Sequence, residues 1–339
     1  MVKPKPLVSV IIPCKLVSQF VLNQVIPSFK KQSYKRFEVI LLPDKNKTRL
    51  KVPAFVQIYA TYPRTRPADK RDFGVTKARG EIVAFIDDDV VVSRNWLLKA
   101  VMCFEESKEI SSVCGPGLTP DSDSLRAQVS GLVWSTWIGA GGAGTYRCTQ
   151  QRRRFVDDFP TFNLLVRKDD FLKIGGFSSK FWPGEDTKLC HDLVYKLNKK
   201  ILYDPEVLVY HCRRPVFLSH LKQISRYGLH RGHFTKILPK TSRRLGYFIP
   251  FLFTLSLFVI PVLAAVFYPV YPLFSKFLVI FYLIELAVYS FFVLLTSLVT
   301  GLRKRSFLVG FLLYPGIVTT HLVFGFQFGR GLLKKNLDI

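Results

Sequence analysis

Three adjacent carboxylates, Asp87, Asp88 and Asp89, follow an apolar run, Ile82–Ile86. Side chains alternate along an extended chain, so Asp87 and Asp89 are expected on one side and Asp88 on the other. Carboxylates held this close repel each other unless a cation lies beside them. Oxygen ligands favour Mg²⁺ or Mn²⁺, which also bind phosphate oxygens. The cluster therefore predicts a metal site, and the alternative is an acidic turn after a buried strand.

Short apolar runs predict the sheet that must position these carboxylates. The runs are rich in Val, Ile and Leu, are bounded by turn residues and show continuous hydrophobicity, which indicates a largely parallel sheet covered on both faces. A helix-length segment separates the first two runs, so they predict a βαβ unit, and a helix is expected over Ala68–Arg79. The four predicted strands are Leu7–Pro13, Phe37–Leu42, Val56–Tyr59 and Ile82–Ile86.

Acidic residues lie just beyond two of these strands. Asp44 follows the second strand, as Asp87 follows the fourth. In an open parallel sheet the ligand binds at the carboxyl ends of the strands. Further along, a helix is predicted over Asp186–Asn198, entered through Pro183-Gly184-Glu185, and the glycine-rich segment Ser130–Gly144 is expected to be a loop, either near a site or on the surface.

Three long apolar stretches end the chain: Ile249–Tyr268, Phe277–Thr300 and Phe307–Phe328. Each is close to the roughly 20 residues that span a bilayer, although buried core helices are the alternative. Arginines before the first stretch and after the second predict a hairpin with both ends in the cytoplasm. If the third stretch also crossed, the basic residues at the C-terminus would lie outside, and a re-entrant or interfacial segment would keep them inside. Both topologies stay open.

The first residues contain no predicted signal peptide. Leu7–Ile12 is too short for the apolar region of such a signal, and it ends in Pro13 without a small-residue cleavage site. The first 245 residues are therefore expected in the cytoplasm, which makes the chain a multi-pass protein of the cell membrane with its soluble part inside.

The 339-residue chain has a net charge of +25 and is 49% hydrophobic. This length suffices for one catalytic domain and a membrane region. A basic domain beside a membrane is attracted to anionic lipids, and positive potential also suits sugar nucleotides or lipid phosphates. Nucleic acid would favour the same sign, but no nucleic-acid-binding motif is present. We therefore expect no nucleic-acid partner.

Four segments occur in order and at family-like spacing over about residues 7–215. They are VSVIIPCK, KRDFGVTKARGEIVAFIDDD, NLLVRKDDFLKIGGF and WPGEDTKLC. Together they resemble family 2 glycosyltransferases of the GT-A fold, which are inverting enzymes that use nucleotide sugars. The resemblance implies a catalytic domain over 1–214, expected in the cytoplasm. The pattern of apolar and basic residues adds an amphipathic interface-helix region over 215–245 and a membrane domain of two or three helices over 246–339.

The resemblance assigns residues to the nucleotide-sugar donor: Pro13, Asp44, Arg71, Asp87 and Asp88. Asp44 matches an aspartate that hydrogen-bonds the nucleobase, and a turn aspartate is the alternative. Arg71 stands where the family usually has an Arg-Asn pair, with Asp72 here in place of the asparagine. Asp87 is expected near the ribose and Asp89 on Mg²⁺ or Mn²⁺, which would clamp the diphosphate of a UDP- or GDP-sugar.

Glu185 and Asp186 resemble the family's glutamate-aspartate element at a helix start. Asp186 would act as the general base that accepts a proton from the attacking hydroxyl, and Glu185 would lie on the acceptor side. The alternative role for Asp186 is an N-cap, which an aspartate suits.

Gln223, Arg226 and Tyr227 resemble the Q-x-x-R-W element of membrane-bound polysaccharide synthases, with tyrosine in place of tryptophan. Apolar residues recur around it at helical spacing among basic ones, which is typical of an amphipathic helix in a membrane interface. The element would close the active site from the membrane side, and a purely anchoring helix is the alternative. His211 matches a position where some related folds place a metal ligand; a structural histidine is the alternative.

One departure concerns the nucleotide. The family commonly has an Asn-Glu pair near Leu16 and Val17, where this chain has apolar residues. The base or ribose is therefore expected to be held differently, and the resemblance does not separate UDP from GDP.

A candidate base at Asp186 favours a hydroxyl acceptor, because a polyprenyl phosphate is already ionised near pH 7 and needs no base. With the membrane segments, this predicts transfer of one sugar to a lipid-linked saccharide at the cytoplasmic face. The alternatives are a polyprenyl-phosphate glycosyltransferase, a processive polysaccharide synthase, which the Gln223–Tyr227 element favours, and a membrane-anchored binding module without activity.

Overall fold

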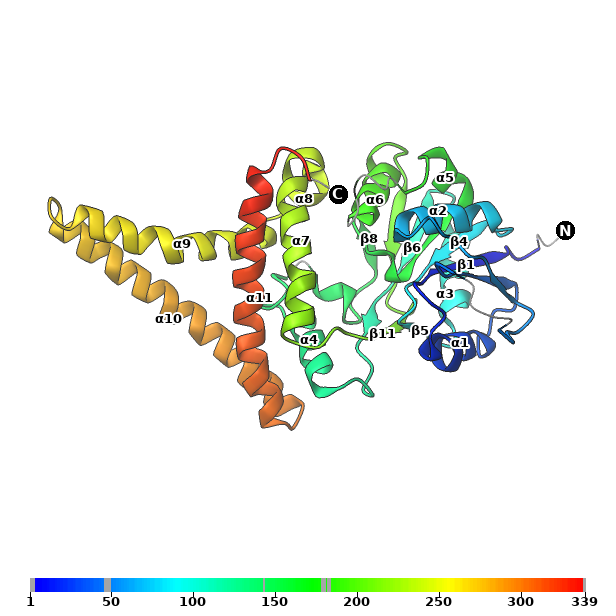
Figure 1. Ribbon diagram of the computed structural model, residues 1–339, viewed down its shortest axis with the longest axis horizontal. Coiled ribbons are helices and arrows are strands. Elements are labelled where there is room, and N and C mark those ends of the chain that lie inside the picture. Colours follow the sequence, from blue (N-terminus) through cyan, green and yellow to red (C-terminus); the bar gives the residue numbers. More distant parts are fainter. Residues whose placement is uncertain (1–3, 46–49, 143, 178–180, 182–183, 338–339) are drawn as a thin grey trace. The chain divides into compact units, whose positions relative to one another are not determined.

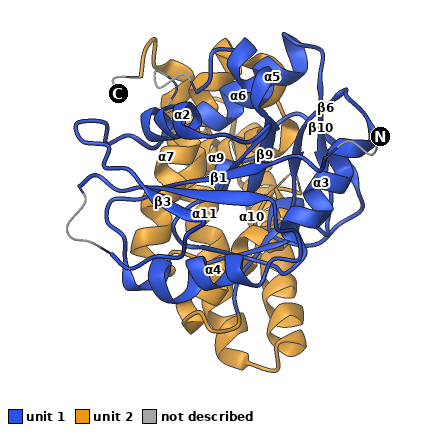
Figure 2. Cartoon of the chain, turned by 90° about the vertical axis from the view of Figure 1, so that its right-hand side faces the viewer, with its two compact units in different colours: residues 1–120, 146–212, 339 blue, residues 121–145, 213–338 orange. Residues whose placement is uncertain are grey.

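The computed structural model describes residues 4–45, 50–142, 144–177, 181 and 184–337. Within it the chain forms two compact units (Figure 2). Unit 1 contains residues 1–120 and 146–212, and unit 2 contains residues 121–145 and 213–338. The predicted catalytic residues up to His211 belong to unit 1, and the apolar C-terminal helices belong to unit 2.

An eight-stranded sheet forms the core of unit 1, in the order β3-β2-β1-β4-β9-β6-β10-β8. The parallel pairs are β3-β2, β2-β1, β1-β4 and β6-β10, whereas β9 and β8 run antiparallel to their neighbours. The predicted mostly parallel sheet is therefore confirmed. Its strands are β1 Val8–Pro13, β2 Phe37–Leu42, β3 Val56–Ile58, β4 Ile82–Phe85, β6 Ile110–Cys114, β8 Arg154–Val156, β9 Leu164–Arg167 and β10 Lys200–Tyr203.

Helices cover both faces of this sheet. Figure 1 shows α2, α5 and α6 on one face and α1 and α3 on the other. This cover explains why β1 and β4 are buried along their whole length and why their sequences are continuously apolar. The helices of unit 1 are α1 Ile26–Lys30 after a π-helical turn Val21–Val25, α2 Pro67–Lys77, α3 Trp96–Glu106, α5 Lys168–Lys173 and α6 Glu185–Tyr195.

Helix α2 lies unusually close to the sheet. It begins at Pro67, whose fixed φ suits a first helical position. A Cβ at Gly74 would lie 2.7 Å from Ile11 Cγ2 and 2.8 Å from Leu42 Cδ1, so glycine permits the close approach to β1 and β2. The polar residues at positions 70–72 of α2 are thereby brought to the carboxyl ends of these strands.

A second, three-stranded sheet has the strand order β5-β11-β7. Strand β5 is Val90–Val92, β7 is Gly117–Leu118 and β11 is Val209–His211. Because β5 begins directly after the three aspartates, its pairing with β11 brings His211 opposite Val90.

Unit 2 consists of helices. They are α4 Leu125–Ser135, α7 Leu218–Ile237, α8 Pro239–Ser242, α9 Leu245–Phe267, α10 Pro272–Arg303 and α11 Phe307–Leu333. The last three are long and apolar enough to cross a membrane. The helix expected around the Gln223–Tyr227 element is present as α7, and its placement at a membrane interface stays a prediction.

Helices α7 and α11 run parallel and side by side (Figure 1), from a 2.9 Å hydrogen bond between His220 Nε2 and Thr320 Oγ1 to a 3.2 Å contact of His233 Nδ1 with the Lys334 carbonyl. Glycines permit this contact. A Cβ at Gly232 would lie 2.0 Å from the Phe328 carbonyl oxygen, so any side chain there would separate the two helices.

The expected loop over Ser130–Gly144 is partly wrong, because α4 continues to Ser135. The helix begins behind Ser124, whose hydroxyl accepts the Ala127 N–H. Val129 and Val133 of α4 pack in one buried cluster with α11 residues. Glycines and tryptophans suggested irregular structure, but tertiary packing stabilises the helix.

Candidate active site

The three aspartates lie in a turn between β4 and β5. Asp87 follows the buried Ile86, and Asp88 and Asp89 form a turn that the Val90 N–H closes on the Asp87 carbonyl at 3.3 Å. The carboxyl oxygens of Asp87 and Asp89 lie, together with a ring nitrogen of His211, within 4.8 Å of one another. The expected alternation along an extended strand is therefore not the reason that Asp87 and Asp89 converge; the turn is.

Backbone pairing positions His211. The Cys212 N–H donates to the Asp89 carbonyl at 3.2 Å, and His211 Nε2 lies 3.3 Å from Asp89 Oδ1. Behind the imidazole, the Phe162 ring is 4.8 Å away between centroids. A Cβ at Gly117 would lie 2.6 Å from the Phe162 ring and 3.2 Å from His211 Cβ, so glycine on β7 leaves room for both rings.

Asp87, Asp89 and His211 form the candidate metal site. Within the described part of the chain, no other group of three His, Cys, Asp or Glu side chains has this geometry. All three are partly accessible, so an ion could reach them. Two carboxylates suit Mg²⁺ or Mn²⁺, and the imidazole offers a nitrogen as a third ligand atom.

Asp88 lies outside this cluster. Burial, followed by the charges of Asp89 and Asp87, raises its pKa to about 6. The Asp88 carboxyl is therefore protonated at higher pH than an ordinary aspartate.

Arg71 links two parts of the site. Its Nη2 lies 2.7 Å from Asp87 Oδ1 and its Nη1 lies 3.0 Å from Glu185 Oε1. The arginine side chain is only 4% exposed. A planar guanidinium can donate to two carboxylates at once, so Arg71 connects the end of β4 to the start of α6.

Lys70 is a site residue that motif comparison alone did not identify. Its ammonium group is buried, forms an ion pair with Asp44 and donates to the Cys14 carbonyl at 2.6 Å. Cys14 directly follows Pro13, the last residue of β1. The lysine therefore brings Pro13 and Asp44 together at the carboxyl ends of β1 and β2. Its position immediately before Arg71 was the available signal.

Asp72 was noted only as a departure from the family pattern. Its Oδ1 accepts the Phe177 N–H at 2.9 Å. Burial raises the pKa of Asp72 to about 7, and the nearby charges of Asp69 and Glu185 act in the same direction. Three consecutive residues of α2 thus contact the ends of β1, β2 and β4, the turn before α6, and α6 itself.

Glu185 and Asp186 are the first two residues of α6. The N-cap is Gly184, at φ 152°, so the alternative that Asp186 is the N-cap is wrong. Glu185 is buried against Arg71, while Asp186 is partly exposed and its Oδ1 accepts the Thr187 N–H at 2.7 Å. A helix N-terminus favours both negative charges. Pro183, expected to lead into this helix, lies outside the described residues.

Gln223, Arg226 and Tyr227 lie on α7 in unit 2. Arg226 is exposed, and the Tyr227 ring packs edge-on against Trp134 at 5.9 Å between centroids. The other edge-on neighbour of Trp134 is His220. Burial lowers the pKa of His220 to about 4, so this histidine is a neutral hydrogen-bonding residue at pH 7.

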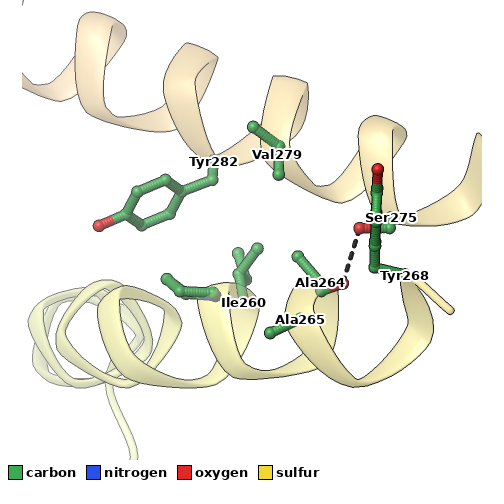
Figure 3. A pocket seen from close by; sticks show the side chains of 8 residues that line it. Ile260, Ala264, Ala265, Tyr268, Ser275, Val279 and Tyr282 are labelled. Carbon is green, nitrogen blue, oxygen red and sulfur yellow. Dashed lines mark hydrogen bonds between the residues drawn. The ribbon is translucent and has the colours of Figure 1, made fainter. Parts of the chain in front are cut away.

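A crevice between α9 and α10 is lined almost entirely by apolar side chains (Figure 3). Its volume is about 300 Å³, and Pro261, Ala264 and Ala265 leave it room on the α9 side. Ser275 of α10 donates to the Ala264 carbonyl of α9 at 2.6 Å (Figure 3). No carboxylate or histidine lines it, so it offers no groups for the chemistry of sugar transfer.

The model of the family described as glycosyl transferase family 2 matches residues 9–174. Pre-mycofactocin glycosyltransferases from two Mycobacterium tuberculosis strains, CDC 1551 / Oshkosh and ATCC 25618 / H37Rv, are each 24% identical over 166 residues, which are 48% of this chain and 33% of the relative. The chain therefore spans about a third of the length of these curated relatives.

A mannosyltransferase from Pyrobaculum calidifontis, solved with GDP-Man and Mn²⁺, has a similar fold. The TM-score is 0.55 at 16% sequence identity, covering 98% of this chain and 89% of the other. Because the similarity covers 98% of this chain, it includes the C-terminal helices as well as the sheet. Residues 9–174 of this chain thus match the glycosyl transferase family 2 model, and the chain has a GT-A-like fold followed by helices long and apolar enough to span a membrane.

Proposed function

We propose that this glycosyltransferase moves one sugar, with inversion, from a UDP- or GDP-sugar to a hydroxyl group of a lipid-linked glycan at the cytoplasmic face of the cell membrane. One observation carries the proposal: Arg71 joins Asp87 of the candidate metal site to Glu185, the residue next to Asp186. A donor-binding group and a candidate base thus lie on elements that one side chain connects.

The donor would bind at the carboxyl ends of β1, β2 and β4. Asp89 and His211 would hold Mg²⁺ or Mn²⁺ with Asp87, which would also approach the ribose, and a bound ion would neutralise charge on the departing diphosphate. Pro13 and Asp44 would contact the nucleoside, with Asp44 kept in place by Lys70. The Pyrobaculum mannosyltransferase contains GDP-Man and Mn²⁺, so these are the first donor and ion to test.

Asp186 would accept the proton of the acceptor hydroxyl. Its partial exposure at the start of α6 leaves it accessible to an acceptor, and a positioned carboxylate contributes about 10²- to 10⁴-fold in such a role. A phosphate acceptor would need no such base, which is why we favour a hydroxyl. Gln223, Arg226 and Tyr227 would contact the acceptor from α7.

The contacts within unit 2 favour two membrane crossings. Helices α9 and α10 are 22% and 6% buried in their most apolar windows, whereas α11 is 39% buried. Helix α11 packs along α7, which carries the exposed Lys222 and Arg226. Such charges are costly in hydrocarbon, so α7 and α11 would lie together in the interface. This topology keeps the C-terminal lysines in the cytoplasm, as the positive-inside rule favours.

A donor screen tests the proposed function. Membranes containing the full chain would be incubated with radiolabelled UDP- and GDP-sugars and Mn²⁺ or Mg²⁺, with or without chelator. We expect chelator-sensitive transfer of one sugar to the lipid fraction, abolished by Asp89→Asn and unaffected by Asp169→Asn, which removes an exposed carboxylate of α5. Transfer that survives complete metal removal would contradict the metal role.

The chemical nature and the length of the labelled product distinguish the alternative enzyme classes. A sugar-phosphate-lipid that is cleaved by mild acid would identify a polyprenyl-phosphate glycosyltransferase, and long products on a sizing gel would identify a processive synthase. Asp186→Asn should lower the transfer rate at saturating donor and acceptor by at least about 100-fold. An unchanged rate would exclude Asp186 as the base.

A further inference from the structure

The Asp72 carboxyl contacts a glycine turn that precedes α6. Asp72 Oδ1 accepts the Phe177 N–H at 2.9 Å. The preceding residue, Gly176, has φ +74°, and a Cβ there would lie 2.6 Å from the same oxygen. Only glycine combines this backbone conformation with so close an approach. The turn and the carboxyl therefore fit one another closely.

The turn places the Phe177 ring beneath Arg71. The ring is buried and packs against Phe85 and Phe171, with centroids 4.9 and 5.4 Å away. The Arg71 guanidinium carbon lies 5.7 Å from the Phe177 centroid, within the range of a cation–π contact. Phe177 thus supports the guanidinium and connects it to the core of the sheet.

Few other groups fix the guanidinium. Its two terminal nitrogens contact Asp87 and Glu185, and its Nε has no hydrogen-bond partner among the described residues. The plane of Arg71 is therefore set by the two carboxylates and by the ring beside it. A displaced Phe177 would remove this aromatic support of the bridge.

We propose that Asp72 is a positioning residue, whose carboxyl fixes the Gly176–Phe177 turn and thereby holds the Arg71 guanidinium in its bridge between Asp87 and Glu185. The effect on donor binding rests on the proposed function, because it requires that Asp87 and Arg71 act at the nucleotide. The effect on the bridge itself does not.

Charge should modulate this contact. The groups facing Asp72 are Asp69 and Arg71 from α2 and Glu185 from α6, and burial is the largest cause that raises its pKa to about 7. A carboxylate accepts an N–H more strongly than a neutral carboxyl. The turn should therefore be held more firmly above pH 7 than below it, and nucleotide binding should strengthen as Asp72 ionises.

Ionisation of Asp72 should have the opposite effect on folding stability and lower it. In the unfolded chain Asp72 ionises near its ordinary value of about 4, whereas in the folded chain it stays neutral up to about pH 7. Burying the charge therefore costs stability progressively as pH rises from about 4 through 7. Asp72→Asn removes this cost, so its Tm relative to the wild type should increase between pH 5 and pH 8.

The experiment uses the full chain in detergent with Asp72→Asn, Asp72→Ala and the control Asp169→Asn. Binding of UDP and of GDP, each with Mn²⁺, is measured by calorimetry from pH 5.5 to 8.5. We expect Asp72→Ala to weaken binding about tenfold, a change of roughly 1.4 kcal/mol. Asp72→Asn should restore most of it, because its amide oxygen can accept the Phe177 N–H, but without the strengthening between pH 6 and 8. Wild-type binding and pH profile in Asp72→Ala would overturn the proposal, as would an Asp72→Asn variant as weak as Asp72→Ala.

A double-variant cycle tests the bridge without any ligand. If Asp72 acts through Arg71, Asp72→Ala should lower Tm less in an Arg71→Ala background than in the wild type, because contacting residues are not additive. Additive losses would overturn the inference. If the wild type bound neither nucleotide with Mn²⁺, the proposed function would fail while this cycle still decided the role of Asp72.

Discussion

Helix α2 in unit 1 and helix α7 in unit 2 both hold neighbouring segments close, by opposite means. Three successive side chains of α2, at positions 70–72, contact five segments through charged or polar groups. Helix α7 instead has glycines where it meets α11, and Gly228 and Gly232 let the α11 backbone approach closely. Charged contacts can position a reacting group, whereas glycine contacts only bring helices together. The polar contacts of α2 therefore lie among the groups proposed to bind the donor, whereas the glycines of α7 serve the packing of two helices.

Removing Arg71 from α2 should have the largest effect on activity and stability. Arg71→Ala leaves Asp87 and the buried Glu185 without their shared cation, and removing one partner of a buried pair costs about 3 kcal/mol or more. We expect transfer to fall by at least about 100-fold, because about 2.7 kcal/mol of transition-state stabilisation corresponds to that factor. Steady-state kinetics and thermal unfolding would measure both losses.

Arg71→Lys is the matched control. A lysine keeps the charge but lacks the planar fork that spans two carboxylates, so its activity should lie between those of the wild type and Arg71→Ala. If Arg71→Lys were fully active, the two-carboxylate geometry would be irrelevant to the reaction.

The packing of α7 against α11 should be disrupted by added side-chain volume rather than by the loss of a charge. Gly232→Val would place atoms within 2.0 Å of the Phe328 carbonyl, and such overpacking costs typically 1–3 kcal/mol, or about 2–4 °C in Tm per kcal/mol for a domain of this size. Gly144→Ala is the control, because its Cβ would meet Ala140 Cβ at an ordinary 3.6 Å. Thermal unfolding in detergent should show a lower Tm for Gly232→Val alone, and equal values would contradict the close seam.

Protonation of Asp88 should have a smaller effect, on the affinity for Mn²⁺. Burial and its acidic neighbours raise the pKa of Asp88 to about 6, so lowering the pH from 7 to 5 protonates Asp88 and removes negative charge beside the candidate metal site. Mn²⁺ affinity should therefore fall over this range by a few-fold more in the wild type than in Asp88→Asn, by titration calorimetry. Identical slopes for the two proteins would show that Asp88 does not tune the site.

Much of unit 1 was predictable because its strands are continuous apolar runs that end in polar residues. Asp87 and Asp89 stood out because adjacent carboxylates after a buried strand repel one another unless a cation lies beside them, and Arg71 was identified through the family resemblance. Lys70, the contact of Asp72 and the neutral His220 were not predictable, since each depends on tertiary neighbours distant in sequence. Helix α4 was missed for the same reason: its Val129 and Val133 are stabilised by α11, more than 170 positions later.

We expect Asp87, Asp89 and His211 to hold the ion that binds the donor nucleotide. The most direct test is calorimetric titration of UDP and of GDP into the full chain with Mn²⁺, comparing the wild type with Asp89→Asn, His211→Ala and the control Asp169→Asn. We expect at least one nucleotide to bind to the wild type and to Asp169→Asn, and its affinity to fall about 100-fold, or roughly 2.7 kcal/mol, in the other two variants. Wild-type affinity in Asp89→Asn and His211→Ala would show that these residues do not hold the ion.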